Sequence, residues 1–159
     1  MSPERLALSV LAAIAAVILF TAHASELWGG LVPCALCLVE RWPYRAAIAI
    51  GVVGVLLPER FTRIAMVVFG LAMLAAASAA VVHVGVEQGA WKSPLPECVA
   101  PNLSGLSFAE KLARMPERPA KPCDEPTYLI PFLPVSMAAM NLIASLVLAG
   151  AAMWRSRRA

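Results

Sequence analysis

The sequence predicts an all-α integral membrane protein, an up-down four-helix bundle with a long loop between its third and fourth spans. Two properties of the whole chain predict this class. Of its 159 residues, 60% are hydrophobic and only 14% are charged, whereas a soluble domain carries roughly 25% charged residues. The apolar residues also gather in four runs, each close to the roughly 20 residues that a helix needs to cross hydrocarbon. The net charge of +3, without a basic run interleaved with aromatic residues, argues against nucleic-acid binding.

We expect a single membrane domain, 1–159, with spans at approximately 6–23, 38–57, 64–86 and 130–154, and outer loops at approximately 24–37 and 87–129. The first run carries no charge between Leu6 and Thr21. A cleaved signal peptide is the alternative, because Ala22-His23-Ala24 has the small-x-small form. We favour an uncleaved span, since the run is longer than the usual apolar region of about 7 to 15 residues.

The second run ends before Pro58, and counting back about 20 residues from Leu57 sets its start. This count places Cys37 near the membrane boundary and Arg41 about one turn inside it. Pro33 suits the first turn of this helix, where its missing N–H costs nothing. The third run begins at Ile64 and is interrupted by His83 near its exit. The fourth ends at Trp154, before a run of arginines. Small residues within the spans, such as Ala12, Ala76 and Ala149, are typical of closely packed membrane helices.

The distribution of arginine predicts the orientation of the spans. Six arginines lie in the two termini and the 58–63 turn. The first connector has no basic residue, and the five basic residues of the outer segment are spread over a much longer stretch. Under the positive-inside rule, both termini are cytoplasmic and all four cysteines lie on the opposite side. Five aromatic residues are expected at the outer interface: Trp28, Trp42, Tyr44, Trp91 and Tyr128.

The long outer segment contains one predicted helix. Ser107 and Glu110 have the spacing of a capping box, which opens a short helix to about Met115. Phe108, Leu112 and Met115 share a stripe on that helix, and we expect the stripe to lie on the membrane surface.

Cys34 and Cys37 lie three residues apart at a helix start, hence on one face, where the helix dipole favours a thiolate. Arg41 lies one turn beyond Cys37 on the same face. It could be a snorkelling side chain that pairs with Glu40 or headgroups, but buried cations within spans are usually functional. A haem site is excluded because Leu38, not histidine, follows Cys37. A four-thiolate zinc site is disfavoured, because one pair lies at the lipid boundary and the other is widely spaced.

His83 lies at about the depth of Arg41. A histidine satisfied by a helix carbonyl is the alternative, but the two residues together favour a pocket for a planar apolar ligand with carbonyl oxygens, such as a quinone head. Gln88, just outside the span, is a weaker candidate for this pocket. The other cysteines, Cys98 and Cys123, lie in the long outer segment. In an oxidising compartment, the four cysteines read as two disulfides, for which three arrangements exist.

This pattern resembles the DsbB family: Pro33-Cys34-x-x-Cys37 with Glu40-Arg41, then His83, then Cys98 and Cys123 before a fourth span. The family consists of bacterial inner-membrane thiol oxidases that reoxidise the periplasmic thioredoxin-fold oxidant DsbA and pass electrons to quinone. The resemblance covers nearly the whole chain. It implies a quinone-dependent protein-disulfide oxidoreductase with ubiquinone or menaquinone as cofactor, a DsbA-like protein and the lipid bilayer as partners, and cysteines in the periplasm.

The resemblance also implies the roles of the individual residues. Cys37 would interact with the quinone ring, with Arg41 beside it and His83 nearby. Cys34 would exchange with the loop pair, most directly with Cys123, and Cys98 would form the mixed disulfide with the partner. Two alternatives remain open. One is a DsbI-like branch of the family with a dedicated partner, and the other is a non-catalytic four-span protein whose disulfides brace the outer loop.

Overall fold

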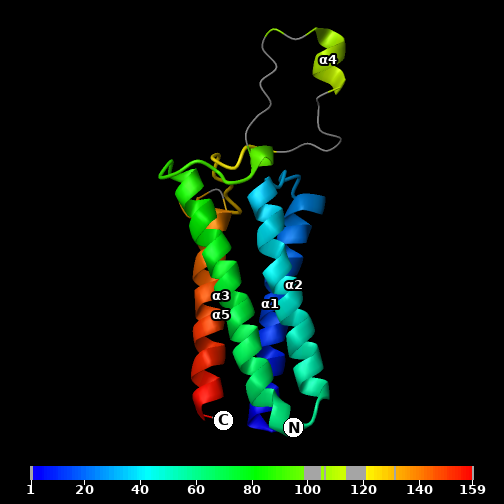
Figure 1. Ribbon diagram of the computed structural model, residues 1–159, viewed down its shortest axis with the longest axis vertical. Coiled ribbons are helices and arrows are strands. Elements are labelled where there is room, and N and C mark those ends of the chain that lie inside the picture. Colours follow the sequence, from blue (N-terminus) through cyan, green and yellow to red (C-terminus); the bar gives the residue numbers. More distant parts are fainter. Residues whose placement is uncertain (1, 99–104, 106, 114–120, 131, 159) are drawn as a thin grey trace.

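The computed structural model of the chain describes residues 2–98, 105, 107–113, 121–130 and 132–158. Within these ranges the chain is helical and has no strand. The long helices are α1 (Pro3–Leu27), α2 (Ala35–Leu56), α3 (Thr62–Glu87) and α5 (Met137–Arg158), and the short ones are η1 (Glu59–Phe61), η2 (Pro96–Cys98) and α4 (Phe108–Ala113). The long helices run side by side, with both termini at one end and α4 beyond the other (Figure 1). The predicted all-α class is confirmed.

Three segments are long and apolar enough to cross a membrane: α1, the η1–α3 segment from Glu59 to Glu87, and α5. The helix α2 has sufficient length, but it carries Glu40, Arg41 and Arg45 in its first half. Length and composition therefore give three candidate membrane spans among the described residues, and α2 differs from them by its charges.

The ends of the helices differ from the predicted ones in two informative places. Cys34 is the N-cap of α2, and its sulfur accepts a hydrogen bond from the Cys37 backbone N–H at 3.1 Å. Pro33 therefore precedes the helix, and its predicted place in the first turn is wrong. The helix α5 begins at Met137, not near residue 130, because the Ser136 hydroxyl accepts a hydrogen bond from the Ala139 backbone N–H at 3.2 Å.

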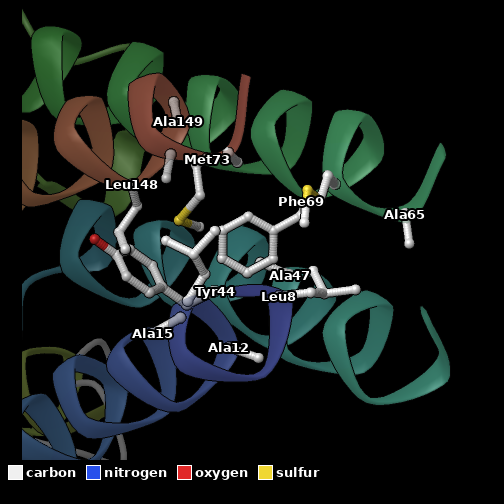
Figure 2. Close-up of a cluster of buried hydrophobic side chains, with 14 residues drawn as sticks. Leu8, Ala12, Ala15, Tyr44, Ala47, Ala65, Phe69, Met73, Leu148 and Ala149 are labelled. Carbon is white, nitrogen blue, oxygen red and sulfur yellow. The ribbon is translucent and has the colours of Figure 1, made fainter. Parts of the chain in front are cut away.

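The core between the long helices is built from large apolar side chains and very small ones. Leu8 and Phe69 are completely buried at its centre (Figure 2). A Cβ atom added at Gly54 would overlap the side chains of Leu8 and Ala65. The backbones of α1 and α3 thus approach α2 closely where small residues allow it.

The predicted capping box is present at the start of α4. The Ser107 backbone N–H donates to Glu110 Oε2 at 2.9 Å, and the Glu110 backbone N–H donates to Ser107 Oγ at 3.4 Å. Hydrogen bonds from Ser107 lower the pKa of Glu110 below its ordinary value. Phe108 and Leu112 are exposed. Because Met115 lies outside the described residues, docking of this stripe on the membrane remains a prediction.

Candidate active site

The first cysteine pair occupies the start of α2. The Cys34 and Cys37 sulfurs are 2.6 Å apart and neither belongs to a disulfide. Cys34 is buried, and Cys37 is partly exposed. The hydrogen bond from the Cys37 thiol holds the pKa of Cys34 below its usual value, although burial acts in the opposite direction. This contact favours the thiolate form of Cys34 relative to an isolated thiol.

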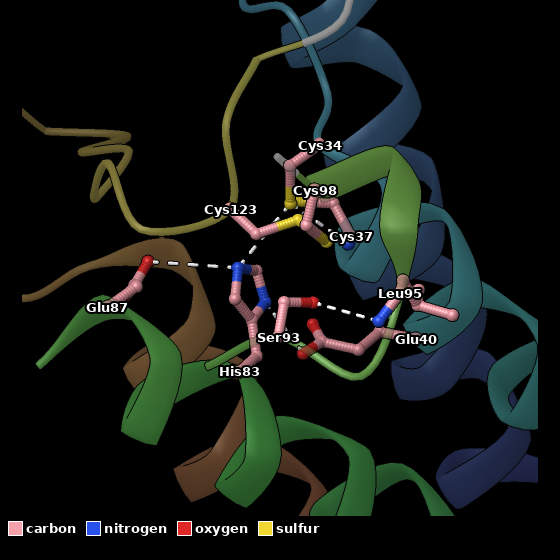
Figure 3. Close-up of a disulfide and its surroundings, with 9 residues drawn as sticks. All are labelled: Cys34, Cys37, Glu40, His83, Glu87, Ser93, Leu95, Cys98 and Cys123. Carbon is pink, nitrogen blue, oxygen red and sulfur yellow. Dashed lines mark hydrogen bonds and ion pairs between the residues drawn. A yellow bond between two sulfur atoms is a disulfide. The ribbon is translucent and has the colours of Figure 1, made fainter. Parts of the chain in front are cut away.

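The second pair, Cys98 and Cys123, forms a disulfide. It lies directly against the first pair, since Cys34, Cys98 and Cys123 are buried in one cluster with Leu36 (Figure 3). An isolated backbone bridge between Cys34 and Lys121 holds the outer segment alongside the start of α2. The structure thus has one disulfide and one free dithiol, whereas the sequence predicted two disulfides. Packing of a disulfide on a dithiol is the arrangement that thiol–disulfide exchange requires.

His83 faces the dithiol from α3. Its Nε2 atom lies 3.4 Å from the Cys34 sulfur, and its Nδ1 atom lies 2.9 Å from Glu40 Oε1. Glu87 Oε1 is farther away, 4.0 Å from Nε2. The histidine is almost completely buried, so its contact with Cys34 is shielded from water.

A line of polar groups continues from Glu40 across the helices. Glu40 Oε2 accepts a hydrogen bond from Asn141 Nδ2 at 2.8 Å, and Asn141 Oδ1 accepts one from the Tyr44 hydroxyl at 2.7 Å. Tyr44 is buried, so its predicted place at the outer interface is wrong. Sequence reasoning considered Glu40 only as a partner of Arg41 and missed Asn141. A lone asparagine within an apolar run was the available signal, because polar residues inside spans are usually functional.

Arg41 points to α1 and not to Glu40. Its Nη1 atom donates to Glu26 Oε2 at 2.7 Å and lies 3.2 Å from His23 Nδ1. Its Nη2 atom donates to the Ala22 carbonyl at 3.5 Å. Arg41 is buried among these groups, which explains how its charge is accommodated.

A cavity of about 270 Å³ lies beside the first cysteine pair. Its walls come mainly from α1 and α5, which contact one another little, and from the first turns of α2. Cys37, Arg41 and His83 all line it. Gln88 is not among the lining residues; it caps α3 and is exposed. Val17, on the α1 wall, is largely exposed, so the cavity borders the outer surface of the helices.

The site combines a disulfide, a dithiol, a buried histidine and an apolar cavity with a cation at its edge. Cys34, Cys37 and His83 also offer three ligand atoms within 4.8 Å of one another, a set that could bind a thiophilic metal ion. The neighbouring disulfide favours redox chemistry, because a dithiol in contact with it can exchange electrons by sulfur–sulfur bond transfer.

Comparison with known proteins gives one match. The family model described as "Disulfide bond formation protein DsbB" matches residues 4–155, which include all four cysteines, Arg41 and His83. Neither the curated proteins nor the solved structures compared with the chain give a significant match.

Proposed function

The chain belongs to the DsbB family of disulfide bond formation proteins, and from this membership we propose that it is a quinone-dependent protein-disulfide oxidoreductase of the bacterial inner membrane. In this proposal it reoxidises a periplasmic DsbA-like thiol oxidase and passes the electrons to a membrane quinone. The observation that carries the proposal is the packing of the Cys98–Cys123 disulfide against the Cys34–Cys37 dithiol, whose second cysteine lines an apolar cavity.

Electrons would move through the two cysteine pairs in turn. The partner's two thiols reduce the Cys98–Cys123 disulfide through a mixed disulfide at Cys98, and the partner leaves oxidised. The loop dithiol then reduces a Cys34–Cys37 disulfide, with Cys123 attacking Cys34. Each transfer breaks one sulfur–sulfur bond and forms another, so electrons and protons balance.

The cavity fits a quinone head group in size and chemistry. Its volume, about 270 Å³, is far larger than the roughly 30 Å³ that one water takes up. Its walls are mostly apolar, while the Arg41 guanidinium and the Asn141 amide supply donors for carbonyl oxygens. When bound, ubiquinone or menaquinone would accept two electrons and two protons from the dithiol. Cys37 would face the ring, and Arg41 would orient it.

A membrane acceptor suits the energetics of this reaction. DsbA is strongly oxidising, at about −120 mV, so its reoxidation requires a terminal acceptor of higher potential. Lipid-soluble quinones provide one only at the bilayer. The position of the cavity at the outer surface of α1 and α5 supports entry from the lipid.

We also propose that α2 is the fourth span, with both termini cytoplasmic and the cysteines periplasmic. The charges of Glu40 and Arg41 favour this assignment when burial is considered, because both side chains are turned inward and paired. The termini and the 58–63 turn, which together carry six arginines, lie at the opposite end of the helices from the start of α2 and the end of α3 (Figure 1).

A purified system tests the proposal. The full-length protein is mixed with a reduced DsbA-like protein and a short-chain ubiquinone analogue, and quinone absorbance and partner thiols are followed together. We expect quinone reduction to match the loss of partner thiols, and Cys37→Ser to abolish both under turnover. Unchanged quinone and unchanged partner thiols with the wild-type protein would reject the oxidoreductase assignment in favour of disulfides that brace the outer loop. Activity confined to one dedicated partner would indicate a DsbI-like branch.

A further inference from the structure

We propose that His83 transfers the proton of Cys34, accepting it when Cys34 attacks and returning it when Cys34 leaves, and that Glu40 positions His83 for this transfer. The inference rests on the proposed oxidoreductase function and deepens it, because it assigns the proton that Cys34 gains as the leaving group in the proposed turnover and loses when the same exchange runs in reverse.

The contacts of His83 define the direction of proton transfer. Glu40 Oε1 lies 2.9 Å from Nδ1, so a protonated Nδ1 donates a hydrogen bond to the Glu40 carboxylate and keeps its proton. The neutral ring then presents the Nε2 lone pair to the Cys34 sulfur, 3.4 Å away. Nucleophile, imidazole and carboxylate follow one another as in enzymes that activate a cysteine or serine.

Glu40 is fixed on both of its oxygens, which suits a positioning role. One oxygen contacts His83, and the other accepts a hydrogen bond from Asn141 at 2.8 Å, which Tyr44 orients in turn. Glu87 is the competing carboxylate on α3. It lies 4.0 Å from Nε2, the nitrogen that faces Cys34, and its other oxygen accepts a hydrogen bond from the Ser136 hydroxyl. Glu87 therefore cannot fix the Nδ1 proton.

The step is balanced within the chain. The proton of Cys34 passes from Sγ to His83 Nε2, and the Cys34 thiolate attacks Cys123 within the loop disulfide. The Cys34–Cys123 bond forms, the Cys98–Cys123 bond breaks, and Cys98 leaves as a thiolate. In the direction of the proposed turnover, Cys98 attacks Cys123 in the Cys34–Cys123 bond, Cys34 is the leaving group, and His83 returns the proton.

The remaining charged and titratable groups around His83 are few among the described residues. On α2 these are Cys37, Arg41 and Tyr44, and on α3 there is Glu87. Asn141 of α5, and Ser136 just before that helix, are uncharged. Arg41 is neutralised by Glu26 of α1, and the loop disulfide does not titrate. Glu40 is thus the carboxylate in hydrogen-bonding contact with the ring.

Exchange within the quinone-free protein measures this step directly. In a Cys37→Ala background of the full chain, attack by Cys34 releases the Cys98 thiol, which excess maleimide traps. Mass spectrometry of the peptides then gives the rate of forming the Cys34–Cys123 disulfide between pH 5.5 and 9.5. We compare Glu40→Gln, Glu40→Asp and His83→Gln, with Glu59→Gln at the far end of the molecule as the matched control.

We expect Glu40→Gln to slow the exchange roughly 10- to 100-fold near pH 7. The rise of the rate with pH should also move to higher pH. The rates should converge above the ordinary thiol pKa of about 8.5, where Cys34 ionises without help. Glu40→Asp should recover part of the rate, His83→Gln should be at least as slow as Glu40→Gln, and Glu59→Gln should match the parent.

Three results would overturn the assignment: a Glu40→Gln profile that coincides with the parent, a loss by one constant factor at every pH, or a shift caused by Glu87→Gln instead. Should Glu40→Gln fail to fold, Asn141→Ala, which frees only one oxygen of Glu40, must give a smaller shift in the same direction. Quinone reduction by the wild-type protein is measured in parallel. Its absence would reject the proposed function while the exchange profile still reports on His83.

Discussion

Replacing Arg41 by alanine separates a binding role from a structural one. The guanidinium has several N–H donors. Its contacts with Glu26 and His23 engage Nη1 closely, whereas Nη2 reaches the Ala22 carbonyl only at 3.5 Å. Donors remain for a carbonyl oxygen in the cavity that Arg41 lines. A hydrogen bond from a charged group contributes about 1.5–3 kcal/mol, so Arg41→Ala should raise the apparent Kd for quinone roughly 10- to 150-fold.

The same substitution should cost little stability. Its partner Glu26 retains 35% of its side-chain exposure, so the carboxylate left behind can be hydrated. The loss should therefore stay well below the roughly 3–5 kcal/mol of a broken, fully buried pair. Binding should therefore suffer more than folding, and Arg41→Lys, which keeps the charge without the planar fork, should fall between alanine and the wild type.

A quinone titration of single-turnover oxidation of the dithiol measures the affinity, and unfolding in detergent measures the stability. Arg45→Ala is the matched control, because this substitution removes the same charge at a position away from the cavity. Arg45 lies over the ring of the exposed Trp42. An Arg41→Ala affinity within twofold of both the wild type and Arg45→Ala would refute the binding role. Arg41 would then serve only to join α2 to α1.

Cys98→Ala should abolish oxidation of the partner, while the reduced Cys34–Cys37 dithiol should still reduce quinone in one turnover. Thiol trapping of the partner measures the loss. Normal oxidation of the partner would contradict the role assigned to Cys98. Gly54→Val should destabilise the packed helices by about 1–3 kcal/mol, because the added atoms overlap neighbouring side chains; an unchanged unfolding midpoint in detergent would mean that the helices separate without penalty. Because the pKa of Glu110 is lowered in the folded protein, its carboxylate stabilises α4 at any pH above the ordinary carboxyl pKa. This stabilisation is lost as the pH falls through the lowered pKa. Amide hydrogen exchange of α4 should show that loss, and Ser107→Ala should remove the pH dependence.

Local patterns predicted the parts of the molecule that depend on neighbouring residues. The spacing of Ser107 and Glu110 was sufficient for a capping box, because both hydrogen bonds form within one turn. The three-residue spacing of Cys34 and Cys37 was likewise sufficient to bring their sulfurs together. The start of α2 was missed by one or two residues because a cysteine sulfur, not the preferred serine or aspartate, caps it.

Contacts between helices could not be predicted in this way. Counting was enough to place Arg41 one turn beyond Cys37 on α2. Its partner Glu26, however, depends on how α1 is rotated about its own axis and on the extension of α1 to Leu27. Tyr44 was assigned to the interface because the aromatic-belt rule concerns depth and not the face of the helix. Only packing against α5, and the hydrogen bond to Asn141, brings it inside.

The charges of α2 are explained by the division of the site between two faces. Glu40 and Arg41 are adjacent, and successive residues of a helix are turned by about 100°, so the two side chains reach different neighbours. Arg41 pairs with α1 at the cavity, while Glu40 contacts His83 of α3 and Asn141 of α5. Cys37 lies one turn before both. Electrons would thus leave at Cys37 toward the cavity, while the proton of Cys34 would pass to His83, which lines the same cavity from α3. A more apolar α2 would resemble the other spans in composition, but it would lose the side chains that hold His83 and the cavity edge in place.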